Sequence, residues 1–163
     1  RPGMPPNAFQ TLDDAGRPVI AFTLPLIAQV ENSDELAFVM AHEAAHHIAG
    51  HLDRMQESAA VGAAVFGRIA GRMGTGDPDS IRAAREVGAA LAARRFSQDY
   101  ELEADALGTV ITAAAGYDPL RGAAFFSRLP DPGNRFLGTH PANAARIAIV
   151  RQTAAEIGFV PVN

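Results

Sequence analysis

Cysteine is absent from this chain of 163 residues. Without cysteine there is no disulfide framework, no thiol nucleophile and no cysteine-based structural zinc knuckle. An oxidising compartment is compatible with this composition, although the lack of cysteine does not require one. Any metal site or catalytic group in the chain must therefore be built from other side chains.

Long apolar segments are absent too. The longest apolar run, from Ala59 to Gly67, has nine residues and ends at Arg68, whereas a helix that spans a bilayer needs about 20. The chain begins at Arg1 instead of a methionine, so we expect it to be a mature or trimmed piece. Membrane association is then expected only through a segment upstream of Arg1.

A strong charge of either sign is also missing. The formal net charge is −4, and no basic stripe with interleaved aromatic residues is present, so nucleic acid is not expected as a partner. Hydrophobic residues make up 48% of the chain and charged residues 20%, as in ordinary globular proteins. The length predicts a single domain, residues 1–163, with its own core. No feature of the sequence indicates an oligomeric state.

The stretch His42-Glu43-Ala44-Ala45-His46 is the feature around which the chain is organised. Histidines four residues apart lie on the same side of a helix, so His42 and His46 can hold one metal ion together. Glu43 then lies beside the metal, where a general base for an activated water is needed. The alternative is a buried helix that uses its histidines for packing alone.

A third ligand is required, because a catalytic zinc usually has three protein ligands and one open position. In the metzincin pattern a glycine and a histidine would stand where this chain has Ala49 and Leu52, so that route is excluded. His47 and His51 are expected to point to the far side of the helix, as surface or packing residues. An aspartate elsewhere in the chain would also serve, but no pattern marks one.

The remaining candidate for the third ligand lies in the stretch Tyr100-Glu101-Leu102-Glu103-Ala104-Asp105. Glu101 and Asp105 are four residues apart and share a helix face. We expect Glu101 to bind the metal, and Asp105 to accept a hydrogen bond from a histidine N–H and fix its tautomer. Glu103 is expected to point elsewhere. The alternative is a solvated acidic helix face that binds no metal.

The fold class predicted is α+β and mostly α, with a small N-terminal β-hairpin packed on a metal-binding helix bundle. The hairpin is expected from residues 7–11 and 17–23 around a turn at residues 13–16. Substrate is expected to bind by β-addition along its second strand, at Val19, Ile20, Ala21 and Phe22. Residues 1–6 are expected to be extended, and residues 74–80 and 130–139 to be loops. Helices are expected over residues 34–57, 80–95, 97–115, 118–129 and 142–157.

Residues 58–74 consist almost entirely of small residues. Small side chains at helical spacing permit close helix packing. The same segment would also suit a mobile lid, a dimer contact or a membrane-surface contact, and the sequence does not decide among these roles.

Several motifs together resemble one known family. They are Asn7-Ala8-Phe9, the stretch from His42 to His46, the pair Glu101 and Asp105, the segment from Ala115 to Pro119, and Thr139-His140-Pro141 followed by Arg146-Ile147. In this order they resemble the zinc metalloendopeptidase family of the CAAX prenyl endopeptidases and HtpX. Within that family the sequence is most similar to the soluble periplasmic and lipoprotein members of the BepA and LoiP kind.

The resemblance implies a gluzincin that binds one Zn²⁺ through His42, His46 and Glu101, with Glu43 as general base. It implies a periplasmic or cell-envelope location, soluble or lipid-anchored, and a polypeptide substrate, extended and unfolded or misassembled. His140 and Arg146 are candidates for a second electrophile at the substrate carbonyl. His140 has two alternative roles, as a zinc ligand that keeps the enzyme latent or as a structural residue. One alternative function is a latent or non-catalytic zinc-binding module. Another alternative is a structural protein in which the metal only holds helices together.

Overall fold

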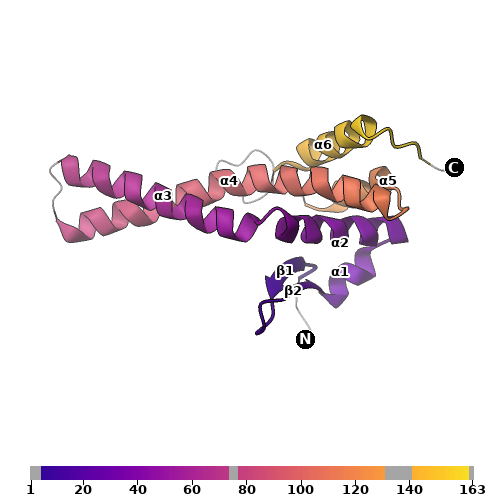
Figure 1. The fold of residues 1–163 in the computed structure, drawn as a ribbon, viewed down its shortest axis with the longest axis horizontal. Helices are drawn as coiled ribbons and strands as arrows, with labels where there is room; N and C mark the ends of the chain where they lie inside the picture. Colours follow the sequence, from indigo (N-terminus) through magenta and orange to yellow (C-terminus); the bar gives the residue numbers. More distant parts are fainter. Residues whose placement is uncertain (1–4, 74–76, 131–140, 162–163) are drawn as a thin grey trace.

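The structure, a computed structural model, describes residues 5–73, 77–130 and 141–161 (Figure 1). It is mostly helical, with a small N-terminal two-stranded antiparallel sheet, which confirms the predicted fold class. The elements, in chain order, are β1 (Ala8–Leu12), β2 (Pro18–Phe22), α1 (Leu24–Gln29), α2 (Ser33–Ile48), α3 (His51–Arg72), α4 (Pro78–Ala114), α5 (Pro119–Ala123), the 3₁₀ helix η1 (Ala124–Arg128) and α6 (Asn143–Glu156).

The predicted β-hairpin is present and lies beside α2 (Figure 1). Its turn is held by Asp13, whose Oδ1 accepts hydrogen bonds from the backbone N–H groups of Ala15 and Arg17, both at 2.9 Å. Gly16 completes the turn with φ +76°, a left-handed conformation that glycine adopts at little cost. Local turn chemistry therefore fixes the hairpin register.

Helix α2 begins where its capping residues predict. Asn32 accepts a hydrogen bond from the N–H of Glu35 at 3.0 Å, and the Glu35 carboxylate accepts one from the N–H of Glu31 at 2.9 Å, which satisfies two donors at the helix start. Glu35 is buried and receives Arg128 Nη1 at 2.7 Å. This ion pair ties η1 to the start of α2.

The prediction of one helix over residues 34–57 was wrong, because the helix breaks at Gly50. Gly50 has φ +64°, and its N–H donates to His47 O at 3.1 Å to close the end of α2. A left-handed glycine is the usual way to end a helix. Helix α3 then starts at His51, so His51 does not continue the helical spacing of α2.

Residues 78–114 form one helix of 37 residues, α4, where the sequence predicted two helices divided near residue 96. Neither glycine nor proline occurs between Gly88 and Gly108, so nothing in that stretch interrupts the backbone hydrogen bonds. The start is earlier than predicted, because Asp77 caps the helix through the Ser80 N–H at 3.0 Å. Pro78 occupies the first turn, where a missing N–H is tolerated.

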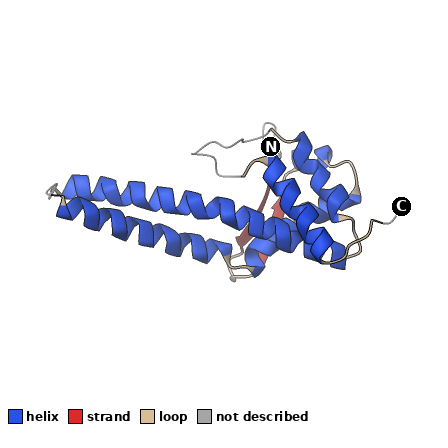
Figure 2. Cartoon of the chain, turned by 90° about the horizontal axis from the view of Figure 1, so that it is seen from above, coloured by secondary structure: helices blue, strands red, loops and turns tan. Residues whose placement is uncertain are grey.

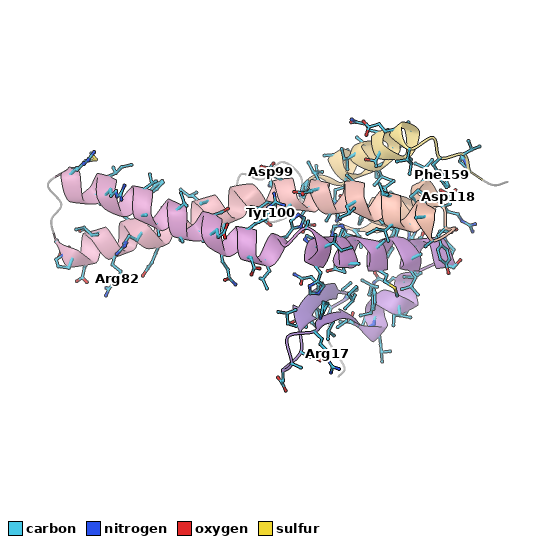
Figure 3. All side chains as sticks on the ribbon, viewed as in Figure 1. Arg17, Arg82, Asp99, Tyr100, Asp118 and Phe159 are labelled. Atoms are coloured by element: carbon cyan, nitrogen blue, oxygen red, sulfur yellow. The ribbon has the colours of Figure 1, made fainter. Side chains whose placement is uncertain are left out.

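Helices α3 and α4 form a long antiparallel arm that extends away from the rest of the molecule (Figure 2). Arg82 lies near its far end (Figure 3). The helices touch at a pair of glycines, because a Cβ placed on Gly62 would lie 2.2 Å from the carbonyl oxygen of Gly88. Residues 58–72 thus form most of α3 and pack closely on α4, while their part in a lid, a dimer or a membrane contact remains a prediction.

The hydrophobic core lies at the other end of α4, where α2, η1 and α6 meet. Phe38 of α2 and Phe126 of η1 are both buried and pack edge to face with their ring centroids 5.6 Å apart. The predicted helix over residues 118–129 is instead α5 followed by η1, and α6 lies within one residue of its predicted ends. Among the described residues, no helix combines the length and the apolar character that crossing a bilayer requires.

Candidate metal centre

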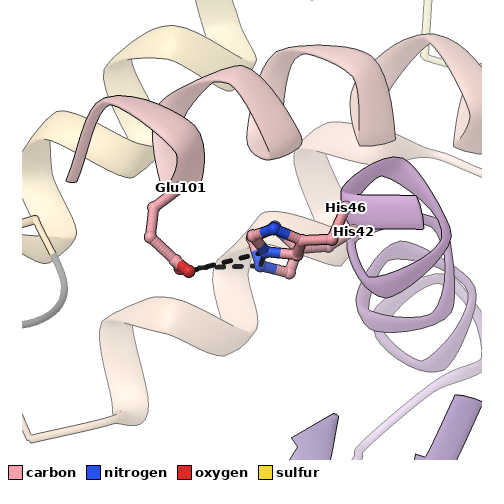
Figure 4. A group of neighbouring side chains, drawn as sticks. All are labelled: His42, His46 and Glu101. Carbon is pink, nitrogen blue, oxygen red and sulfur yellow. Dashed lines mark hydrogen bonds and ion pairs between the residues drawn. The ribbon is translucent and has the colours of Figure 1, made fainter. Parts of the chain in front are cut away.

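Three predicted ligands converge between α2 and α4: His42, His46 and Glu101 (Figure 4). His42 Nε2 lies 3.6 Å and His46 Nε2 lies 3.5 Å from the two carboxylate oxygens of Glu101. The two Nε2 atoms are 3.1 Å apart. The helices approach closely because α4 carries Gly108 here, where a Cβ would lie 3.1 Å from the backbone nitrogen of His42.

The chemistry of these donors fits a zinc ion. Two imidazole nitrogens and one carboxylate oxygen, all within 4.8 Å of one another, face a common point. Three protein ligands of these types are the set that a catalytic zinc uses. His42 and Glu101 are buried and His46 is half-buried, so water competes weakly for the site. The group fits an HExxH-plus-Glu site.

Asp105 and Arg146 lie behind His42. Asp105 is fully buried, and its Oδ1 lies 2.9 Å from His42 Nδ1. Arg146 of α6 donates from Nε and Nη2 to the two Asp105 oxygens, both at 2.7 Å, and stacks 3.7 Å from the ring centroid of Phe126. Arginine carries no acceptor, so the Nδ1 proton of His42 can be given only to Asp105 in this cluster. In the neutral ring, which a metal ligand must be, this tautomer leaves the Nε2 lone pair facing Glu101.

Opposing effects act on the pKa of His42. Burial lowers it, but hydrogen bonds to Asp105 and Glu101 outweigh burial and raise the pKa to about 9. In the metal-free protein His42 therefore holds a second proton at neutral pH. A metal that binds here must release that proton, as is usual where imidazole is a ligand.

The sequence profile of Peptidase family M48 matches residues 3–154. The chain belongs to peptidase family M48. This is a family of zinc metalloproteases, so the expected enzyme class is confirmed. The match covers the hairpin, the metal cluster and nearly all of α6, and it agrees with the resemblance found in the motifs.

Two relatives of the M48 chain carry a more specific name. The beta-barrel assembly-enhancing protease of Escherichia coli (strain K12) is 28% identical over 143 residues, which is 78% of this chain and 28% of that protein. A Vibrio cholerae protein that bears the same name provisionally is 32% identical over 151 residues, 84% of this chain and 31% of that protein. The chain thus spans less than a third of the length of these relatives. No solved structure matches it with statistical significance.

The break at Gly50 brings a third histidine, His51, next to the metal cluster of this M48 chain. His51 is buried, and its Nδ1 lies 2.8 Å from His46 Nδ1, so the prediction that His51 points to the far side was wrong. Its ring stacks on Tyr100, with centroids 4.8 Å apart. Burial, and after it the neighbouring His46, lower the pKa of His51. The ring is therefore neutral at neutral pH.

Glu103 lies outside the group of three candidate ligands, in line with the expectation that it points elsewhere, and contacts His51 and Arg54 instead. Its Oε2 lies 3.4 Å from His51 Nε2 and 3.0 Å from Arg54 Nη1. One sequence signal could have indicated the positions of His51 and Glu103. It is Gly50, a residue type that often ends a helix, placed directly before His51. Tyr100, which contacts His51 and Arg54, lies on α4 close to where α3 begins (Figure 3).

A cleft of about 480 Å³ opens onto the three candidate ligands. Glu43 lines this cleft together with Asn7 and with residues 8–10 of β1. Residues 19–22 of β2, where substrate was expected, are not among the described residues that line it. Arg146 also lines the cleft, while two of its donors are held by Asp105. His140 lies outside the described residues, so its predicted roles stay predictions.

Proposed function

We propose that this chain is a zinc-dependent metalloendopeptidase that hydrolyses peptide bonds in extended polypeptides. The observation that carries the proposal is the group His42, His46 and Glu101, with Glu43 in the same cleft. A metal that only staples helices needs no neighbouring base, so the presence of Glu43 favours catalysis. Membership of family M48 supports the same conclusion.

In the proposed mechanism the chain holds one Zn²⁺ through His42, His46 and Glu101. When bound, the zinc supplies Lewis acidity for activating water and polarising the scissile carbonyl. A carboxylate oxygen of Glu43 takes the proton of the attacking water and then delivers it to the leaving amine. Asp105 accepts the Nδ1 proton of His42 and keeps the tautomer that turns Nε2 toward the metal.

Arg146 has a different role in this proposal from the one that the sequence indicated. Two of its donors are bonded to Asp105 at 2.7 Å, and its Nη2 lies 3.8 Å from Glu101. Because these donors are already hydrogen-bonded to a carboxylate, they are not free to stabilise the substrate carbonyl. We therefore assign Arg146 to holding Asp105 against His42, and the second electrophile at the carbonyl stays with His140 as a hypothesis.

The substrate class proposed is unfolded or misassembled protein of the cell envelope. Two relatives are named for enhancing beta-barrel assembly, and the resemblance to periplasmic and lipoprotein members supports the same location. A protease that acts on many unfolded chains must bind backbone more than side chains, and strand addition at a free sheet edge meets this need.

The hairpin offers such an edge on β1. Asn7 O accepts a hydrogen bond from Thr23 N, and Asp13 N donates one to Arg17 O, so Asn7–Thr23 and Asp13–Arg17 are hydrogen-bonded pairs. In an antiparallel ladder hydrogen-bonded pairs alternate with pairs that are not hydrogen-bonded. In this register Gln10 and Ile20 form a pair that is not hydrogen-bonded. The backbone groups of Gln10 then point away from β2, on the strand that lines the cleft. No other described strand pairs with β1. We propose this edge in place of the β2 edge.

A matched pair of proline substitutions tests the edge. Gln10→Pro removes an outward N–H beside the cleft, and Ile20→Pro removes an outward N–H on the opposite edge; neither breaks a ladder hydrogen bond. We expect kcat/KM for an unfolded substrate to fall about tenfold in Gln10→Pro, by one lost backbone bond, and to stay unchanged in Ile20→Pro. Loss in Ile20→Pro alone would instead support the β2 edge that the sequence predicted.

The central proposal is tested on wild type and Glu43→Gln together. Bound zinc is measured by native mass spectrometry, and cleavage is measured on unfolded casein. We expect zinc in both proteins and cleavage in wild type alone. Zinc in both with cleavage in neither would favour the latent or non-catalytic module. Cleavage by Glu43→Gln at the wild-type rate would refute Glu43 as the base, and wild type without zinc after refolding with metal would refute the proposal.

A further inference from the structure

His46 and His51 form the shortest histidine contact near the site, and neither the motif nor the proposed mechanism uses it. The Nδ1 atoms are 2.8 Å apart, and the rings meet at 75° with centroids 4.9 Å apart. His51 is 4% exposed, so water does not replace this contact freely. A buried pair of ring nitrogens at this distance must share one proton.

The position of that proton is fixed by the neighbours. His46 Nε2 faces His42 and Glu101 and must be unprotonated if it is a ligand, so the proton of the neutral His46 ring is on Nδ1. His46 Nδ1–H then donates to His51 Nδ1, which must carry a lone pair. The proton of the neutral His51 ring is therefore on Nε2, which lies 3.4 Å from a carboxylate oxygen of Glu103.

We propose that His51 is a positioning residue for the metal site: it accepts the Nδ1 proton of His46 and so fixes the tautomer and orientation in which His46 Nε2 faces His42 and Glu101. His46 thus receives from a histidine the support that His42 receives from Asp105. The inference rests on the proposed function only in taking His46 as a metal ligand. Partners behind the ligands typically change metal affinity by about 10- to 100-fold.

The side chains that hold His51 in place support this role. Tyr100 stacks on the ring with an interplanar angle of 15°. Glu103 faces Nε2 and is itself held by Arg54 Nη1 at 3.0 Å, and the Arg54 guanidinium lies 4.5 Å from the Tyr100 ring centroid. The imidazole is therefore constrained from its face and from its outer edge, so Nδ1 stays directed at His46.

Two variants of similar size separate the hydrogen bond from packing. His51→Asn keeps an acceptor oxygen near the place of Nδ1, and His51→Leu removes it; both lose the stacking on Tyr100. Zinc dissociation constants are measured by competition with a chelator. We expect His51→Leu to bind zinc about 10- to 100-fold more weakly than wild type and His51→Asn to recover most of that loss. Equal affinities in the two variants would overturn the proposal.

A second measurement does not depend on metal or on the folding of a variant. The ring nitrogens of His46 in the metal-free wild type are observed by ¹⁵N nuclear magnetic resonance. We expect the Nδ1–H tautomer, and the Nε2–H tautomer would overturn the proposal. Wild type that binds no zinc would refute the proposed function, while this spectrum would still decide the role of His51.

Discussion

At the scale of single residues, Asp105 is the group on which the candidate metal centre depends most directly outside its ligands. Its two oxygens contact His42 Nδ1 and the Arg146 guanidinium in a site closed to solvent. Asp105→Asn keeps an oxygen for His42 but removes the carboxylate that the buried guanidinium contacts at 2.7 Å, so that only Glu101 at 3.8 Å remains as its counter-charge. We expect zinc affinity to fall about 10- to 100-fold and the free energy of unfolding to fall by about 3 kcal/mol.

These two quantities are measured by chelator competition and by urea denaturation of the metal-free protein. Asp53→Asn is the control, because it changes an exposed carboxylate on α3 in the same way. An Asp105→Asn protein with wild-type affinity for zinc would show that His42 does not need this partner.

Some residues of the site could be predicted from the sequence and others could not, for a physical reason. His42 and His46, like Glu101 and Asp105, are pairs at i and i+4 within one helix, and helical geometry alone puts each pair on one face. His51 reaches the cluster because Gly50, with φ +64°, interrupts the helix and so changes the spacing between His46 and His51. The contact between His51 and His46 depends on the backbone angle of one residue, which the periodicity of the sequence does not predict.

At the scale of elements, the junction between α2 and α3 depends on Gly50. A side chain with a Cβ is strained at φ +64°, while asparagine tolerates this region better than alanine. We expect Gly50→Ala to lower the free energy of unfolding by about 1 kcal/mol and Gly50→Asn to lower it less, measured by urea denaturation. Gly50 has open space around its Cβ position, so a larger loss in Gly50→Asn would point to a steric cause.

The ion pair between Glu35 and Arg128 joins two elements and predicts an acid response. Burial raises the pKa of Glu35, but hydrogen bonds from Arg128 and the Glu31 N–H bring it below the ordinary 4.5. A carboxylate with a lowered folded pKa stabilises the fold above the unfolded value, and this stabilisation is lost as the pH falls through the folded pKa. Unfolding free energy measured against pH should therefore drop below about pH 4.5.

Glu35→Gln is the matched variant for this experiment. We expect it to be less stable than wild type by about 2 kcal/mol at neutral pH, with a smaller loss of stability on acidification. If the two proteins lose stability in parallel below pH 4.5, the acid response comes from other carboxylates.

Element ends were predictable where a local signal exists. Asn32 caps α2 and Asp13 closes the hairpin turn, and both act over a few residues. The division of α4 into helices over residues 80–95 and 97–115 was predicted wrongly, since no residue at that division breaks a helix. Packing of α4 along α3 and then α2 stabilises one continuous helix. Such contacts between distant segments cannot be predicted from a short stretch of sequence.

At the scale of the whole molecule, the arm depends on the contact between Gly62 and Gly88. A Cβ at Gly62 would lie 2.2 Å from the Gly88 oxygen and 2.6 Å from the Ala92 Cβ, so the two helices must move apart. We expect Gly62→Ala to lower the free energy of unfolding by about 2 kcal/mol. Gly71→Ala is the control: no atom lies within 4 Å of its Cβ position, and alanine should raise helix stability by up to about 1 kcal/mol.

Both variants are compared by thermal denaturation, and zinc affinity is measured alongside. None of the metal ligands lies at the contact of Gly62 with Gly88 and Ala92, so zinc affinity should stay at the wild-type value in both. Equal melting temperatures for Gly62→Ala and Gly71→Ala would show that the arm accommodates a methyl group at the contact.

The continuity of α4 has a mechanical consequence. One uninterrupted helix contains Glu101 in its C-terminal half and forms half of the arm with its N-terminal half, so a rigid tilt of α4 would move both together. Pro78 and Glu101 are separated by about 35 Å along the axis, and a tilt of about 5° that lets the carboxylate follow a metal would swing the tip by about 3 Å. Because these 163 residues contain no cysteine, one thiol introduced near Pro78 could carry a probe that reports this displacement.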